Sequence, residues 1–272
     1  MLFIRFVVVA ALLHLASPTI DARTLRRSRS PGRTSTITLH RRLHVNTLIT
    51  EPGSAEVEWN NAFSLGGNYS MPSTVKFTPK GSHILWGRTE FSAGFDALSS
   101  VREGDHRVTH FSDRMTFGAN CVIVDGERLD IAIAPQVSFF LRDGGGARLG
   151  ATGIARYDWG RNSAGMTLTW TGATTSSATN PAGSFNLGVR YGRRLAASGF
   201  LGRFSAHINL VSEQSTGVDR LVSAFEGVEC QLSEKVALDV STQHWSVVGG
   251  IVDHQIVAGL TVNLGRPRRW FH

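Results

Sequence analysis

The sequence predicts an all-β fold, a closed antiparallel up-and-down transmembrane β-barrel of about 12 strands that covers residues 51–265. Three observations support this fold class. Apolar and polar residues alternate with a period of two along most of the chain after residue 50, the alternating runs are long, and the connections between the runs tend to alternate between short and long.

The alternation marks each predicted strand. At residues 129–139, one parity consists of Leu, Ile, Ile, Pro, Val and Phe, whereas the other consists of Asp, Ala, Ala, Gln and Ser. Most runs exceed the usual strand of about 5–6 residues and suit a tilted strand of about 9–11 residues that crosses a bilayer. The predicted strands lie near residues 54–64, 73–78, 84–96, 108–123, 127–142, 147–160, 164–171, 184–194, 201–212, 222–232, 235–245 and 252–264.

The lengths of the connections indicate two different barrel ends. Transmembrane barrels have short periplasmic turns and longer outer loops. We expect the short turns at 79–83, 124–126, 161–163 and 233–234, and the long loops at 65–72, 97–107, 172–183 and 213–221, with 143–146 as a short connection where a long one is due.

Charge and composition exclude several classes of protein. The formal net charge is +7, but residues 1–50 hold eight of the 28 basic residues and one of the 21 acidic ones, so residues 51–272 are neutral overall. Nucleic-acid binding requires a basic surface on the folded part, so no nucleic-acid partner is predicted. With 42% hydrophobic residues the chain is too apolar to be disordered. After the N-terminus, the absence of a long apolar run excludes a polytopic helical membrane protein.

The two ends of the chain are expected to lie outside the barrel. Residues 1–22 have the pattern of a secretory signal peptide, with Arg5 before a short apolar run, although an uncleaved anchor is an alternative. Residues 23–50 form a basic arm that we expect to be disordered; it could be a solvated tether, touch anionic head groups or plug the lumen. Residues 266–272 form a basic and aromatic tail. The predicted location is the outer membrane of a Gram-negative cell after signal-peptide cleavage, with outer-membrane lipid and the barrel-assembly machinery as partners.

A β-sheet can cross lipid only if it closes, because an open edge leaves backbone groups unpaired in hydrocarbon. The apolar parity then faces lipid and the polar parity lines a lumen. A soluble β-sandwich also alternates, but the long strands, the three lysines among 28 basic residues and the simple meander favour the barrel. The candidate lumen-lining residues have mixed charges, which predicts that they pair with each other more than they select an ion: Arg88, Glu90, Arg114, Asp130, Arg142, Arg156, Asp158, Arg190, Arg203, Asp239 and Asp253.

Two further groups of residues bear on the membrane. Asp113 and Glu226 fall on the apolar parity. We therefore expect each of them to lie in a strand with a β-bulge or near a strand end, because a carboxylate on the lipid face costs little free energy near the membrane interface. Aromatic residues near strand ends suit interfacial girdles: Trp59, Trp86, Tyr157, Trp159, Trp170, Tyr191, Phe200 and Trp245.

Three segments carry a resemblance to a known family. Ile49-Thr50-Glu51-Pro52-Gly53-Ser54-Ala55-Glu56-Val57-Glu58 resembles the opening strand of the outer-membrane family described as "putative MetA-pathway of phenol degradation", Leu187–Gly192 resembles its Gly-x-Tyr strands, and Ala258–Leu264 resembles its closing strand. Thr-Glu-Pro stands where the family usually has Asp-Arg-Pro, and the chain continues past Leu264. The resemblance implies a transporter-like barrel that helps small, often hydrophobic compounds to cross the outer membrane.

The sequence contains few candidates for catalytic or metal-binding groups. His110, Ser112 and Asn120 resemble the catalytic set of outer-membrane phospholipases, but Asp113-Arg114 follows the serine and all three residues share the lumen parity, where lipid does not reach. The ten histidines are scattered, so no metal site and no cofactor are predicted. Cys121 and Cys230 lie in alternating runs and suit small apolar fillers, with one long-range disulfide as the alternative.

The sequence therefore predicts a barrel without enzymatic activity that allows passive or facilitated passage of small, in some cases hydrophobic, molecules. One alternative is a closed structural or surface-binding barrel without transport. A second alternative is an outer-membrane lipid hydrolase.

Overall fold

A computed structural model describes residues 53–64, 68–79, 89–103, 106–110, 114–141, 146–175, 182–217, 219–247 and 252–265. They belong to one compact unit, Thr34–His272. The predicted signal peptide, arm and tail lie outside the described residues, as do Trp86, Arg88, Asp113 and Arg142.

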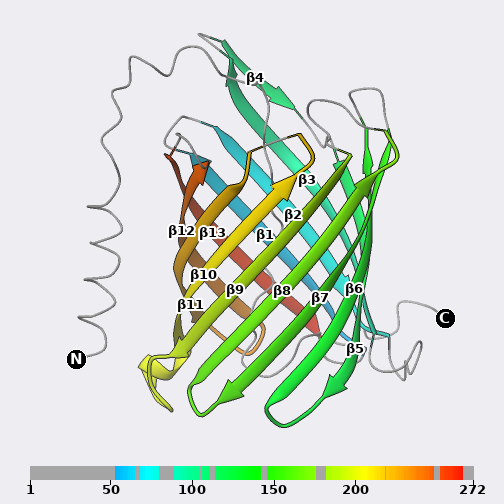
Figure 1. The fold of residues 1–272 in the computed structure, drawn as a ribbon. Coiled ribbons are helices and arrows are strands. Elements are labelled where there is room, and N and C mark those ends of the chain that lie inside the picture. Colours follow the sequence, from blue (N-terminus) through cyan, green and yellow to red (C-terminus); the bar gives the residue numbers. More distant parts are fainter. Residues whose placement is uncertain are drawn as a thin grey trace, which may run out of the picture. The chain divides into compact units, whose positions relative to one another are not determined.

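The described chain consists almost entirely of antiparallel strands (Figure 1). A single 3₁₀-helix of the described part, η2 (Phe200–Arg203), lies between two of them. The strands are β1 (Ala55–Ser64), β2 (Tyr69–Phe77), β3 (Thr89–Glu103), β4 (His106–His110), β5 (Arg114–Asp125), β6 (Leu129–Phe140), β7 (Ala147–Trp159), β8 (Asn162–Ala173), β9 (Gly183–Arg194), β10 (Phe204–Ser215), β11 (Leu221–Gln231), β12 (Val236–Val247) and β13 (Val252–Gly265).

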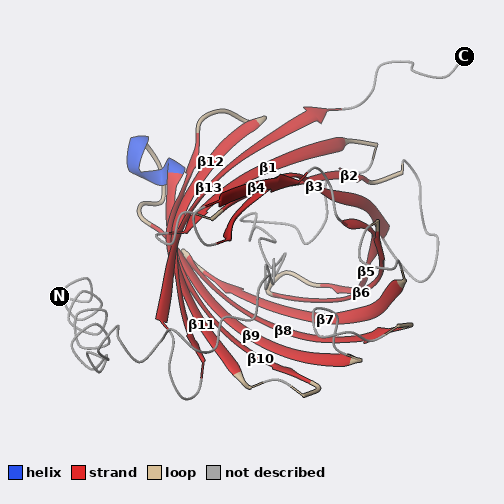
Figure 2. Cartoon of the chain, turned by 90° about the horizontal axis from the view of Figure 1, so that it is seen from above, coloured by secondary structure: helices blue, strands red, loops and turns tan. Residues whose placement is uncertain are grey.

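Twelve of these strands close into a ring, as the view from above shows (Figure 2). Each strand pairs with its neighbour in the chain, and the first strand, β1, pairs with the last, β13, so that Val57 lies opposite Val262 and Trp59 opposite Leu260. The short strand β4 is outside this ring. It pairs with the far end of β3, from Ser99↔His110 to Glu103↔His106, and forms a hairpin arm at one end of the barrel.

Polar side chains lie mainly on the inner face of the barrel wall and large apolar side chains on the outer face, which is the reverse of a water-soluble protein. In β6, Ala132 and Ala134 are buried on the inner face, whereas Ile133 is exposed on the outer face. The inner face of the other strands carries buried polar residues such as Asn120 and Ser241, and large apolar residues such as Phe117 and Val240 are exposed outside. An apolar exterior around a polar interior suits hydrocarbon as the surrounding solvent. Among the described residues, no helix is long and apolar enough to span a membrane.

Several predicted boundaries differ from the structure. The structure describes β2 to Phe77 and β3 from Thr89, so residues 80–88, which include most of the predicted turn 79–83 and the start of the predicted strand 84–96, lie outside the described residues. The predicted strand 108–123 corresponds to two strands, the β4 arm and β5. The pairing of β5 with β6 shifts its register between Val122 and Val124, where β5 contains one residue more than β6. The predicted strand 201–212 begins only at Phe204, because the preceding residues form η2.

The aromatic and cysteine residues are placed as follows. Tyr157 and Trp159 stack with ring centroids 5.7 Å apart at one end of the outer wall, which suits an interfacial girdle. Trp245 instead lies opposite Ser223 and Asp253, on the inner parity, so it does not belong to a girdle. Both Cys121 and Cys230 are free thiols.

Candidate functional site

The charged residues of the inner wall concentrate at one end of the barrel, which we call the short-turn end. Its turns include residues 126–128 between β5 and β6, 160–161 between β7 and β8, and 232–235 between β11 and β12. Gly160 has a φ of +60°, a left-handed conformation that glycine adopts without strain, and this allows β7 to reverse into β8 within two residues.

Further from this end, the inner wall is lined by hydroxyl groups. Thr116 and Ser138 share a hydrogen bond of 2.8 Å between β5 and β6, Thr152 and Thr169 one of 2.9 Å between β7 and β8. Thr171 and Ser184 continue the pattern at 2.6 Å between β8 and β9. A small apolar patch, made of Val122, Ala132, Ala134 and Ile154, interrupts this polar wall on β5, β6 and β7. The inner wall is therefore mostly polar, with one limited apolar surface.

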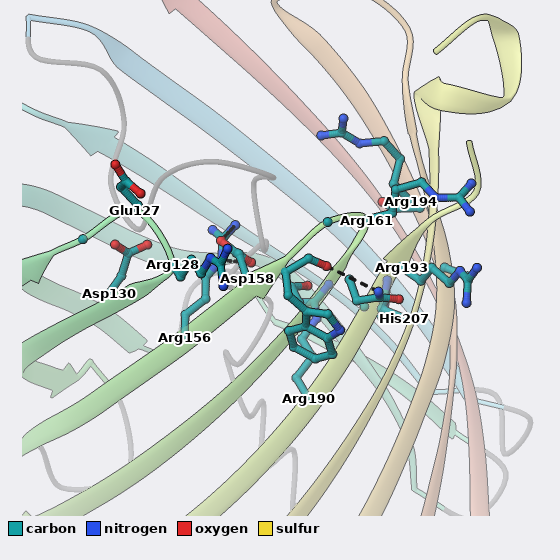
Figure 3. Close-up of a pocket in the computed structure, with 18 residues that line it drawn as sticks. Glu127, Arg128, Asp130, Arg156, Asp158, Arg161, Arg190, Arg193, Arg194 and His207 are labelled. Atoms are coloured by element: carbon teal, nitrogen blue, oxygen red, sulfur yellow. Dashed lines mark hydrogen bonds and ion pairs between the residues drawn. The ribbon is translucent and has the colours of Figure 1, made fainter. Parts of the chain in front are cut away.

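An arginine-lined cavity of about 390 Å³ opens at the short-turn end, between β6 and β10 (Figure 3). Six arginines line it against three carboxylates, and His207 completes the set of titratable side chains. These residues, which we call the arginine cavity, are Arg128, Arg156, Arg161, Arg190, Arg193, Arg194, His207, Glu127, Asp130 and Asp158. Among these lining side chains positive charge exceeds negative charge by three, while Asp239, which contacts His207, adds a carboxylate just outside the lining.

The arginines reach the cavity from both turns and strands. Arg128 and Arg161 lie in the turns that precede β6 and β8, whereas Arg193 and Arg194 are the last two residues of β9. Arg156 and Arg190 come from inner positions of β7 and β9. A strand brings residues i and i+2 to the same face, so Arg156 contacts Asp158 of its own strand, with Nη2–Oδ2 at 2.6 Å and Nε–Oδ1 at 3.0 Å.

A second charged group lies across the ring, on β1, β2 and β3. Lys76 of β2 contacts Glu58 at 2.5 Å and Glu56 at 3.5 Å, and all three side chains are buried. Glu90 of β3 is also buried on this wall. The short-turn end thus has an acidic sector on β1–β3 and a basic sector on β7–β9, on roughly opposite sides of the twelve-stranded ring.

The structure places the predicted lumen residues unequally. Four of them line the arginine cavity: Asp130, Arg156, Asp158 and Arg190. Asp239 is not one of its lining residues, but its carboxylate lies 3.8 Å from Nε2 of His207, which is. Glu90 belongs to the acidic sector, and Arg114 lies at the other end of β5. Arg203 differs from the prediction, because it is exposed in η2 and lies on no strand face. For Asp253 only the position in β13, opposite Trp245, is described.

Sequence reasoning missed the turn arginines Arg128 and Arg161, the strand-end arginines Arg193 and Arg194, and the acidic residues around Lys76. The signal for Arg128 and Arg161 was basic character at or beside the predicted short turns 124–126 and 161–163, and for Arg193 and Arg194 it was a pair of arginines at the end of the predicted strand 184–194.

The catalytic alternative gains no support from geometry. Ser112 and the side chain of His110 lie outside the described residues, and Asn120 is buried on the inner wall. Among the described residues, no three His, Cys, Asp or Glu side chains come together in a group that could hold a metal ion.

The comparisons with known proteins agree with this architecture. The NanC porin has a TM-score of 0.54 and 7% identity, with 76% of this chain and 100% of that chain covered. An outer-membrane channel from Pseudomonas putida F1 has a TM-score of 0.55 and 11% identity, with 79% and 97% covered. The likeness shows that the chain has the fold of these two proteins, a closed antiparallel β-barrel. No protein-family profile and no curated sequence matches the chain.

Proposed function

We propose that this protein lies in the outer membrane and lets small solutes pass through the barrel, with a preference for anions. The arginine cavity is the observation that carries the proposal, because six arginines and three carboxylates line it at the end of the barrel (Figure 3). The exposed apolar outer wall supports a membrane location, and the polar inner wall supports a hydrated path.

The preference for anions has a physical cause. The arginine side chains keep their positive charge at every physiological pH, and walls of low dielectric constant around them strengthen the local potential. Arg156 is neutralised by its contact with Asp158, whereas Arg128 and Arg161 lie in turns and Arg194 lies at a strand end. We therefore expect anions to concentrate at the short-turn end before they pass.

A second candidate solute class is small hydrophobic compounds. The inner apolar patch of Val122, Ala132, Ala134 and Ile154 provides a surface for them, and the resemblance to the MetA-pathway family of transporter-like barrels points the same way. The patch is small beside the hydroxyl-lined wall, so we place anions first. The proposal includes no enzymatic step.

Single-channel recording of the refolded protein in a planar bilayer tests the proposal. Under a potassium chloride gradient, the reversal potential should show chloride preferred over potassium, and the Arg161→Gln/Arg194→Gln variant should reduce this ratio about 2-fold or more. The matched control Arg203→Gln/Arg220→Gln removes two exposed arginines outside the cavity, and it should leave the ratio unchanged. Equal ratios in all three proteins would overturn the preference for anions.

The closed barrel without transport is the competing function. The burial of Glu56, Glu90 and Arg156 favours it, because charged inner residues of an open channel contact water. Liposome swelling separates the two functions when it is measured with the full chain and with residues 23–50 deleted. If neither protein admits small sugars or salts, passage is excluded and the closed barrel is supported.

A further inference from the structure

A group of polar side chains lies on the outer wall of β11, β12 and β13. Thr242 donates a hydrogen bond of 3.3 Å to Glu226, and His244 approaches the same carboxylate at 3.6 Å. The Nδ1 atoms of His244 and His254 are 2.6 Å apart, with the rings at 78° to each other. We call these four residues the outer-wall cluster.

The register of the sheet places the outer-wall cluster on the apolar face. Glu226 lies opposite Ile208 and Thr242, and His244 lies opposite Ala224 and His254. No register shift occurs in these three pairings, so no β-bulge turns the strands over. Glu226 is moreover the central residue of β11, equally far from Leu221 and Gln231. The expectation of a bulge or a strand-end position for this carboxylate is therefore wrong.

The surroundings of the outer-wall cluster are those of a membrane-facing wall. Val228, Val240 and Ile256 point outward beside it, and 44%, 55% and 48% of their surfaces are exposed. On the opposite side of the ring, the corresponding mid-strand residues, such as Ile133 and Leu168, are apolar. The cluster is thus a local exception on an otherwise apolar exterior.

Such a group needs a polar partner in the membrane. Ionisable residues within membrane-spanning segments face protein or water, because hydrocarbon does not solvate them. The side chain of Glu226 is nevertheless 50% exposed, and that of His244 is 28% exposed. Their contacts with each other leave this surface uncovered by the barrel itself.

We propose that a second copy of this chain covers the outer-wall cluster, so that two barrels pack side by side through β11–β13. The cluster is self-complementary: a carboxylate accepts hydrogen bonds and an imidazole donates them, and the two groups lie on neighbouring strands. Across a two-fold axis, Glu226 of each copy meets the histidines of the other, and the flanking valines pack against each other. The interface is independent of what passes through the lumen.

Cysteine crosslinking in a bilayer tests this interface. In a background with Cys121→Ser and Cys230→Ser, the Thr242→Cys variant should form a disulfide-linked dimer on mild oxidation, since equivalent residues near a two-fold axis approach each other. The control Ile133→Cys places an equally outward thiol on β6, across the ring, and should stay monomeric. Equal crosslinking of both variants, or none in Thr242→Cys, would contradict the proposal.

The chemistry of the contact is tested by apolar substitution. Glu226→Leu should reduce the Thr242→Cys crosslink about 5-fold or more, as expected for the loss of a paired polar contact, and the matched control Ala155→Leu on β7 should not. Folding is monitored by the gel mobility of the unheated barrel, and His254→Leu provides a second variant if Glu226→Leu does not fold. A wild-type protein that is monomeric in lipid and retains lipopolysaccharide would overturn the proposal in favour of lipid head groups.

Discussion

Lys76 is the residue that holds the acidic sector together. It lies between Glu56 and Glu58 on the inner wall, and its ammonium group forms an ion pair with both carboxylates. Buried charges remain ionised only when they are paired and hydrogen-bonded. Its place in the sequence, in one of the shortest alternating runs, gives no indication of this role.

Removal of this ammonium should destabilise the barrel. We expect Lys76→Met to lower the free energy of unfolding by about 3–5 kcal/mol, because buried carboxylates then lose their counter-charge. Urea titration of the protein in detergent micelles, followed by tryptophan fluorescence, measures the change.

The exposed Lys235 in the turn between β11 and β12 supplies the control, and Lys235→Met should leave the free energy of unfolding unchanged. The double variant Lys76→Met/Glu58→Gln should recover part of the loss. A stability of Lys76→Met equal to that of the wild type would show that the acidic sector is hydrated.

At the scale of the element, the strands lie very close to each other at one inward-facing glycine, Gly227. A Cβ at Gly227 of β11 would lie 2.6 Å from Cβ of Ser241 and 2.9 Å from Nε2 of His207. The two neighbouring strands, β10 and β12, therefore leave no room for a methyl group. On the outer face the same substitution meets open space: at Gly153 of β7 the nearest atom is the Leu168 carbonyl oxygen at 4.0 Å.

These two glycines form a matched pair for mutation. Gly227→Ala should lower the free energy of unfolding by about 1–3 kcal/mol, because the added methyl group overpacks the inner wall. Gly153→Ala should leave the free energy of unfolding unchanged or raise it slightly. Urea midpoints of the two variants in the same detergent give the comparison. Equal effects would mean that the inner wall relaxes freely around β11.

The sequence predicts the positions of the strands well where the alternation of apolar and polar residues is unbroken. It does not predict how the strand ends and turns are arranged in space. The strands at 129–140, 147–159 and 183–194 follow from period two, since one face of each is apolar. The β4 arm does not follow, because residues 97–107 are predicted as a loop and the alternation at 108–123 is predicted as one strand, whereas the structure has β3 extending to Glu103 and pairing with β4. Trp245 shares its parity with Asp239 and Gln243, and this signal could have placed it inside. The predicted meander places the short turns at one end, but it does not show which of their side chains line one cavity, and this only the structure establishes.

At the scale of the whole molecule, the ring is completed by the seam between β1 and β13. Directly opposite outward residues of this seam can be joined by a disulfide, since facing Cα atoms lie about 5.5 Å apart or less. With both native cysteines replaced by serine, Val57→Cys/Val262→Cys should lose its free thiols on oxidation and run as a crosslinked form on a gel. The control Val57→Cys/Met166→Cys, with the second thiol on β8, should keep both thiols. Free thiols in the first variant would mean that the sheet is open.

The seam also has a consequence for biogenesis. It joins residues near 55–64 to residues near 255–265, so this pairing has the largest sequence separation of any strand pairing in the described chain. Contacts of such high contact order form late, after the loop-closure entropy has been lost. Until the last strand is synthesised and pairs with β1, both edge strands of the sheet are unpaired and its apolar outer face is exposed, and both features favour aggregation. A product truncated before Val252 should therefore be cleared by periplasmic proteases rather than accumulate as a smaller pore.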